Sequence, residues 1–432
     1  MTPRPAGFAA IDFGTSNSAV ALPAGAEGAR LVEVEAGNST MPTAVFYRAD
    51  GALAEPERVY GRAAIAAYVD GVEGRLMRSM KSILGSNLAE QRTEIGGGRS
   101  VPYLDVVAGY LRHLKQRAEA DAGHETSRLV LGRPVFFVDG EPERDRRAQA
   151  ALEAAARAVG FAEVVFQYEP IAAALDHERR VEREQIVLVA DIGGGTSDFS
   201  LVRVGPSRRG RADRRDDILA SHGLHVAGTD FDRQIELEAI LPLLGFRSLG
   251  PAAKGQLPRE VPSRIYFDLA TWHLINTVYT PARVAELRSI RSWYADPLQH
   301  RRLMQVLEAR LGHGLAAEAE AAKIAVTGAG RAHIDLDAVE SGLGAELGRE
   351  QAAAAIDADL ERIAQAARET LRGAGIAPER VEALYFTGGS TGLASLVERI
   401  GAAFPAAARV RGERFASVAQ GLGLHARAVF GG

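Results

Sequence analysis

The sequence contains no cysteine among its 432 residues. This absence excludes disulfide bonds, thiolate metal sites and a cysteine nucleophile, and it fits a protein of the reducing cytoplasm. The sequence also lacks an apolar run long enough to cross a bilayer, and its first residues lack the pattern of a signal peptide. We therefore expect a cytoplasmic protein without a membrane partner. Neither sign of charge dominates, because the formal net charge is -4, and this removes the electrostatic argument for binding nucleic acid.

The remaining composition is that of an ordinary globular protein, and two glycine-rich turns stand out in it. Hydrophobic residues make up 47% and charged residues 25% of a chain long enough for two to four domains or subdomains. Each turn predicts a strand that ends in an aspartate, a tight turn and a second strand. Two such copies, far apart in the chain, indicate duplication of an α/β unit. They read Ile11-Asp12-Phe13-Gly14-Thr15-Ser16-Asn17 and Ala190-Asp191-Ile192-Gly193-Gly194-Gly195-Thr196-Ser197-Asp198.

Both turns have the chemistry of a polyphosphate site. A polyphosphate needs backbone N–H groups that point at its oxygens and no side chain in the way, as at Gly14 and at 193–195. Asp12 and Asp191 offer the hard oxygen ligands that Mg²⁺ prefers. Neither turn is a Walker A loop or a dinucleotide fingerprint. A single Asp-Gly hairpin is common, but the pair, together with a third glycine-rich turn at 387–392, favours phosphate binding. Short donors lie at Thr15, Ser16, Asn17 and Thr196.

Several further segments complete an ordered set of motifs. They are Lys81-Ser82-Ile83-Leu84-Gly85, Glu169-Pro170-Ile171-Ala172-Ala173-Ala174, Gly228-Thr229-Asp230-Phe231-Asp232, Glu320-Ala321-Ala322-Lys323 and Leu384–Gly392. With the two turns, this set resembles the heat-shock protein 70 (DnaK-type) chaperones of the actin-like ATPase superfamily, and most closely their short YegD-like branch. The matching segments run in order from residue 8 to about residue 424, over nearly the whole chain.

The resemblance implies an ATPase that binds ATP/ADP and Mg²⁺. Lys81 and Glu169 would position or activate the attacking water, with Thr196 and Asp198 nearby. Asp12 and Asp191 would hold Mg²⁺ through water molecules. The implied phosphate contacts are Gly14, Thr15, Ser16, Asn17, Gly193, Gly194, Gly195 and Thr196. The implied contacts of the adenosine end are Gly228, Glu320, Lys323, Thr327, Gly388, Gly389 and Ser390.

The same resemblance implies the duplicated, ribonuclease H-like fold of actin-like ATPases, with two lobes of two subdomains each around a nucleotide cleft. We expect lobe I at 1–185, with an inserted subdomain at about 38–102. Lobe II would be 186–432, with its core at 186–228 and about 347–420 and an insertion at about 229–346. Its last helix would pack back toward lobe I.

The sequence departs from the family pattern in two respects, the residues expected around the adenine and the peptide-binding domain. Typical members hold the adenine between two arginines, but Ile324 and Gly392 occupy those positions here, so we expect weaker discrimination of ATP from GTP. Typical members also continue into a peptide-binding domain, which we do not expect in a chain that ends at Gly432.

We interpret the charge-dense segment 207–217 as a solvated hairpin tip rather than a docking patch. We interpret Trp293-Tyr294 as ordinary packing rather than a partner surface.

The expected function is a chaperone-like ATPase in which slow hydrolysis opens and closes the lobes and a protein partner or client reads the closed state. A co-chaperone or exchange factor is a further candidate partner. Two alternatives remain, a small-molecule kinase and a filament-forming protein of the same superfamily. The segments at Lys81 and Glu169 disfavour the kinase, and Lys81 together with the long segment 229–346 disfavours the filament.

Overall fold

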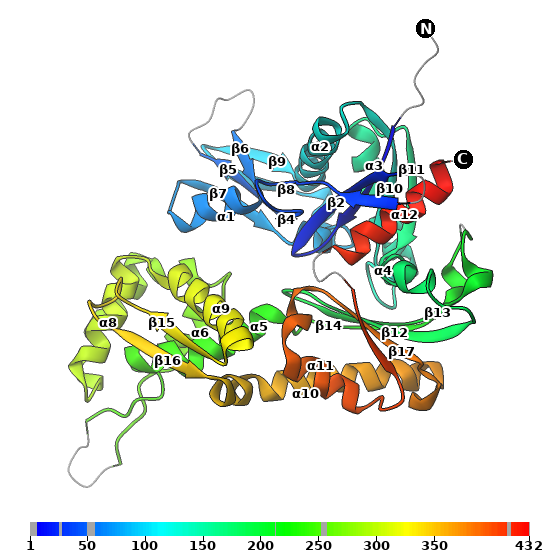
Figure 1. Ribbon diagram of the computed structural model, residues 1–432. Coiled ribbons are helices and arrows are strands. Elements are labelled where there is room, and N and C mark those ends of the chain that lie inside the picture. Colours follow the sequence, from blue (N-terminus) through cyan, green and yellow to red (C-terminus); the bar gives the residue numbers. More distant parts are fainter. Residues whose placement is uncertain are drawn as a thin grey trace. The chain divides into compact units, whose positions relative to one another are not determined.

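The computed structural model describes residues 7–25, 28–49, 57–211, 213–251, 257–412 and 416–431 (Figure 1). Two compact units make up the chain. The first comprises Met1–His225, Gln365–Thr391 and Ile400–Gly432, and the second comprises Val226–Ala364 and Gly392–Arg399. The expected lobe boundary at 185/186 falls inside the first unit, and the division into lobes stays a prediction.

The first unit contains two mixed β-sheets built on one plan. In the first sheet the strand order is β11-β10-β1-β2-β3, and in the second it is β18-β17-β12-β13-β14. In each sheet three antiparallel strands are followed by two strands that run parallel to the first of them. The bounds are Gly7–Phe13 for β1, Asn17–Ala24 for β2, Gly28–Leu31 for β3, Thr126–Arg133 for β10, Glu163–Tyr168 for β11, Gln185–Ile192 for β12, Ser197–Val204 for β13, Ile218–Leu224 for β14, Ala383–Thr387 for β17 and Ala408–Arg411 for β18.

Helices occupy equivalent places in the two halves of the chain. One long helix precedes the first parallel strand, a second connects the two parallel strands, and a third follows them. In the first half these are α2 (Tyr103–Ala122), α3 (Pro142–Ala158) and α4 (Glu169–Glu178), and in the second half they are α10 (Arg349–Ala374), α11 (Ala394–Ala402) and α12 (Ser417–Phe430). This common order of strands and helices is what a duplicated α/β unit predicts.

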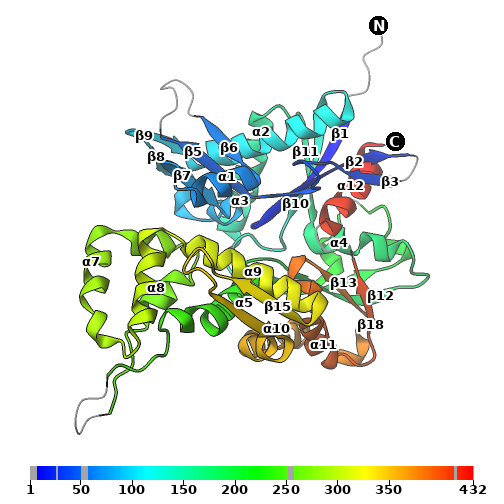
Figure 2. The same cartoon turned by 60° about the vertical axis from the view of Figure 1, so that its left-hand side comes forward.

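Helices α4 and α12 pack tightly against one another in the first unit, and Figures 1 and 2 show α12 beside β1, β2 and α4. Their close approach depends on small residues. A Cβ at Gly421 of α12 would lie 1.8 Å from the carbonyl oxygen of Ala172 in α4. Ala172, Ala173 and Ala174 are buried, in a core shared with strands of both sheets. The alanine run after Glu169 therefore lets a second helix lie directly on α4.

The remaining β-strands and α-helices lie in two long insertions, one in each half of the chain. The first insertion holds β4 (Thr40–Pro42), β5 (Ala44–Arg48), β6 (Arg58–Tyr60), α1 (Gly61–Val69), β7 (Gly74–Arg78), the 3₁₀ helix Met80–Ile83, β8 (Arg92–Gly96) and β9 (Arg99–Pro102). The second insertion, in the second unit, holds α5 (Gly228–Ile235), α6 (Arg264–Leu269), α7 (Pro281–Ser289), α8 (Pro297–Glu308), α9 (Gly312–Ala329), β15 (Arg331–Asp335) and β16 (Gly344–Gly348).

In the part of the chain that the structure describes, no helix combines the length and the apolar character needed to cross a membrane.

Candidate active site

The first glycine-rich turn joins β1 to β2 and is fixed by a residue far from it in the sequence. Asp12 is the next-to-last residue of β1. A Cβ at Gly14 would lie 2.2 Å from the carbonyl oxygen of Asn17, so only glycine fits this turn. The Thr43 hydroxyl donates to the carbonyl oxygen of Gly14 over 2.8 Å and lies 2.8 Å from the Ser18 hydroxyl. Sequence reasoning missed Thr43, because its role depends on the pairing of β4 with β2.

The second turn joins β12 to β13 and is fixed by contacts with the third glycine-rich turn, at 387–392. Gly193 donates its N–H to the carbonyl oxygen of Thr196 over 3.0 Å, and the Ser390 hydroxyl donates to the carbonyl oxygen of Gly193 over 2.7 Å. Gly388 has a φ of +87°, and a Cβ there would lie 2.4 Å from the carbonyl oxygen of Ile192. The 387–392 turn therefore packs against the second glycine-rich turn.

Lys81 and Glu169 form an ion pair, with 2.5 Å between Nζ and Oε1. Glu169 is the first residue of α4, and Lys81 lies in the 3₁₀ helix that follows β7. Ser79, two residues earlier, has a φ of +53° in the left-handed region, which stores strain beside the pair. Burial lowers the pKa of Lys81, but the charges of Glu169 and Asp12 outweigh it and raise that pKa, so the ammonium group stays charged.

Asp12 and Asp191 share one crowded electrostatic environment with this pair. Desolvation by the surrounding protein raises the pKa of Asp12 to about 8, with the charges of Glu169 and Asp191 adding to it and that of Lys81 opposing it. Desolvation raises the pKa of Asp191 to about 7, with further contributions from Asp198 and Glu169. Several acidic side chains therefore surround the single ammonium group of Lys81. A bound cation would reduce the repulsion between their carboxylates.

The donor set fits a hydrated cation better than a chelated one. Among the described residues, no three His, Asp or Glu side chains are grouped closely enough to hold a metal ion directly. A cation beside Asp12 and Asp191 would therefore need other oxygen ligands, such as water. Mg²⁺ retains several of its waters in proteins, so the residues present are compatible with it.

The residues expected at the adenosine end fall into two groups. Gly388, Gly389 and Ser390 belong to the first unit, with the carboxylates and Lys81. Gly228, on α5, and three residues of α9 belong to the second unit: Glu320, Lys323 and Thr327.

Lys323 organises the group in the second unit. Its Nζ lies 2.6 Å from Asp232 Oδ1 and donates to the carbonyl oxygen of Gly228 over 3.3 Å, which joins α9 to α5. Burial raises the pKa of Asp232 to about 6, and Lys323 opposes that rise. Glu320 and Thr327 are exposed. Sequence reasoning quoted Asp232 only as part of a turn and missed it as the partner of Lys323.

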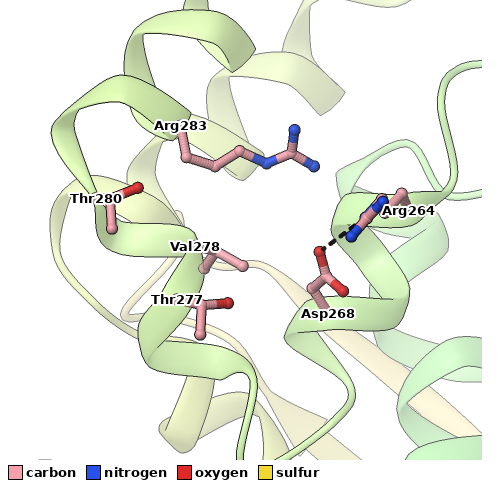
Figure 3. A pocket seen from close by; sticks show the side chains of 6 residues that line it. All are labelled: Arg264, Asp268, Thr277, Val278, Thr280 and Arg283. Atoms are coloured by element: carbon pink, nitrogen blue, oxygen red, sulfur yellow. Dashed lines mark ion pairs between the residues drawn. The ribbon is translucent and has the colours of Figure 1, made fainter.

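A separate pocket of about 320 Å³ lies in the second unit and contains none of the predicted site residues (Figure 3). Arg264 and Asp268, both on α6, form a loose ion pair on one side of it, with 3.8 Å between Nε and Oδ2. Arg283 is paired with Glu286 outside the lining, 2.7 Å away. Both guanidinium groups of the pocket thus already have carboxylate partners. The lining residues are Arg264, Asp268, Thr277, Val278, Thr280 and Arg283.

Comparison with protein families agrees with this geometry. A family model described as Hsp70 protein matches residues 8–238, more than half of the chain. The chain belongs to the Hsp70 family. Membership of this family implies that a protein binds ATP and has ATPase activity. The matched range includes the first two glycine-rich turns, Lys81, Glu169 and Gly228. The residues of α9 and the 387–392 turn lie beyond it.

Proposed function

We propose that this Hsp70 family member hydrolyses ATP slowly to ADP and phosphate, with Mg²⁺, and that the nucleotide state opens and closes its lobes. The Lys81–Glu169 ion pair beside Asp12 and Asp191 is the observation that carries the proposal. Phosphoryl transfer needs positioning and charge neutralisation more than covalent chemistry, and these groups supply both. The likeness to the YegD-like branch is part of the same proposal.

Each group of the first unit has a distinct role in this proposal. The turns at 14–17 and 193–196 bind the phosphates through backbone N–H groups and short side chains. Asp12 and Asp191 hold Mg²⁺ through water, and the ion neutralises the polyphosphate charge when bound. Glu169 orients the attacking water and accepts its proton, Lys81 holds Glu169 and the phosphate in place, and Asp198 and Thr196 support the second turn.

A glycine pair tests the phosphate contacts. Apart from its two chain neighbours, no described residue would lie within 4 Å of a Cβ at Gly195, whereas a Cβ at Gly14 would collide with the backbone of Asn17. We expect Gly195→Ala to keep the melting temperature of the ligand-free protein but to weaken ADP binding at least about tenfold, because the methyl group occupies ligand space. We expect Gly14→Ala to lower the melting temperature. Calorimetric titration and thermal unfolding measure both, and wild-type affinity in Gly195→Ala contradicts the assignment.

The adenosine end is assigned to Gly228, Glu320, Lys323, Thr327 and the 388–390 turn. The Asp232 and Gly228 contacts that fix Lys323 support this assignment. Ile324, the next residue, is 63% exposed and offers an adenine no guanidinium to stack on.

Phosphate release from Mg·ATP and Mg·GTP, with titrations of ADP and GDP, tests the proposal. We expect Mg²⁺-dependent release from ATP, and dissociation constants for ADP and GDP that differ by less than about tenfold. Ile324→Arg should raise the preference for adenine, whereas Ala321→Arg, at another exposed position of α9, should not. Absence of phosphate release, formation of ADP only when a hydroxyl acceptor is added, or nucleotide-dependent sedimentation as filaments contradicts the proposed function.

A protein partner completes the proposal. Trp293 is 53% exposed, whereas its neighbour Tyr294 is buried and its hydroxyl lies 2.9 Å from that of Tyr266. The interpretation as ordinary packing is therefore confirmed for Tyr294 and wrong for Trp293. An exposed tryptophan supports docking of a client, co-chaperone or exchange factor on the second unit.

A further inference from the structure

The charge-dense segment between β13 and β14 folds onto the C-terminal end of α4. Its interpretation as a solvated tip is wrong for Arg214 and Asp217, which are 3% and 2% exposed. Glu178, the last residue of α4, is 1% exposed beside them. Buried charges are retained only where partners satisfy them, so the contacts of this group decide what it does.

Charged side chains in the group satisfy one another. Arg214 donates two hydrogen bonds to the Glu178 carboxylate, over 3.1 and 2.9 Å. The Nε of Arg214 donates to Asp217, and Asp217 also accepts a hydrogen bond from Arg208. Arg208 also donates to Glu184, so these two guanidinium groups face three carboxylates, and each buried charge of the group has a hydrogen-bonded partner of opposite sign.

Backbone groups at the end of α4 are held by the same segment. Arg209 donates to the carbonyl oxygen of Glu178 over 2.7 Å and also to that of Val181. The N–H of Gly205 donates to Glu178 Oε1 over 3.0 Å. A helix end leaves such carbonyls without partners within the helix, and a cation there also complements the helix dipole. The end of α4 is therefore anchored through both its backbone and its side chain.

Helix α4 transmits this anchoring to the active site. Ten residues at 1.5 Å each separate its ends by roughly 15 Å, and its first residue is Glu169. The helix is buried against α12 along its alanine face, so it has little freedom to bend. Arg215, next to Arg214, donates to the hydroxyl oxygen of Tyr168 over 3.2 Å, immediately before Glu169. One segment thus fixes both ends of α4.

We propose that this α4 clamp (Arg208, Arg209, Arg214, Asp217 and Glu178) is a positioning element for hydrolysis. It fixes the axial position and rotation of α4 and thereby holds Glu169 at its distance from Lys81. The inference rests on the proposed ATPase function. A displacement of about 1 Å in a catalytic group lowers a rate by as much as 10²-fold, so loosening a distant helix end changes turnover without touching the nucleotide.

Steady-state hydrolysis by clamp variants tests the inference, at a temperature well below each melting point. Arg214→Lys keeps the charge but loses the bidentate geometry, and we expect kcat to fall about tenfold or more while KM for ATP stays within twofold. Arg209 is exposed, so Arg209→Ala offers a variant that folds, with an expected fall in kcat of about threefold or more. A purely structural clamp would lower the melting temperature and leave kcat per folded molecule unchanged.

Arg302→Lys is the matched control. Arg302 makes a bidentate pair with Glu340 in the second unit, over 3.1 and 2.8 Å, and its replacement should leave kcat unchanged. A fall below tenfold in folded Arg214→Lys, or wild-type kcat in Arg209→Ala, overturns the clamp inference alone. Absence of hydrolysis by the wild-type protein overturns the proposed function instead.

Discussion

Replacing Lys81 with alanine should lower kcat for ATP hydrolysis about 10²-fold or more, with the dissociation constant for ADP changed only a few-fold. The side chain is 9% exposed and its Nζ lies 2.5 Å from Glu169 Oε1. Its removal leaves Glu169 without the cation that holds it and increases the mutual repulsion of Glu169, Asp12 and Asp191. ADP binding should change little because ADP lacks the γ-phosphate, the group on which Lys81 acts during hydrolysis.

Lys115→Ala is the matched control for this variant. Lys115 also makes a 2.5 Å ion pair, with Glu119, and their side chains are 13% and 23% exposed, close to the 9% and 17% of Lys81 and Glu169. Its loss should affect stability at most and leave kcat unchanged. Single-turnover phosphate release measures both variants, and a wild-type rate in Lys81→Ala would refute the catalytic assignment.

Asp12→Asn should make the ligand-free protein more stable at pH 8 while it removes the gain in nucleotide affinity that Mg²⁺ provides. The pKa of Asp12 rises from 3.8 to about 8 on folding. Between about pH 4 and pH 8 the unfolded chain therefore loses a proton that the folded chain keeps. The folded state binds more protons, so the free energy of unfolding falls as the pH rises through this window. Asparagine cannot ionise. The full shift would correspond to about 5 kcal/mol at pH 8, so we expect a gain of at least about 2 kcal/mol there and almost none at pH 4.

Chemical unfolding at the two pH values, with ADP titrations in Mg²⁺ and in chelator, measures both effects. Asp145→Asn is a control that should change the free energy of unfolding in the opposite direction. Asp145 accepts hydrogen bonds from Arg133 over 2.9 Å and from the N–H of Phe137 over 2.6 Å. Loss of that charge should destabilise the protein at pH 8 by about 2 kcal/mol. If Asp12→Asn is less stable than the wild type at pH 8, or keeps the effect of Mg²⁺, the role of Asp12 is wrong.

Local sequence patterns were sufficient for the parts of the site that depend on neighbouring residues. An aspartate at a strand end followed by a glycine turn places Asp12 and Asp191 without any knowledge of tertiary structure. The spacing of Leu104, Val107, Leu111 and Leu114 likewise predicts a helix over 103–122, and these are the observed bounds of α2. Lys81 and Glu169 are 88 residues apart, and only the order of motifs along the chain associated them.

Long-range pairing determined what the sequence could not show. Thr43 reaches Gly14 because β4 pairs with β2, and Asp232 meets Lys323 because α5 packs on α9. The segment around Arg214 illustrates the same limit. Mixed charges at a loop usually indicate solvent exposure, and only the position of Glu178 at the end of α4 shows that they are buried.

The two sheets share one strand order, but they do not carry the same functional groups. Each half contributes one aspartate and one glycine turn, so the groups suited to binding occur in matched pairs. The groups suited to hydrolysis occur singly: Lys81 lies in the first insertion, and the helix equivalent to α4, α12, begins with Ser417 where α4 begins with Glu169. On the proposed function, the features that both halves share therefore serve nucleotide binding, and the features that only one half has serve hydrolysis.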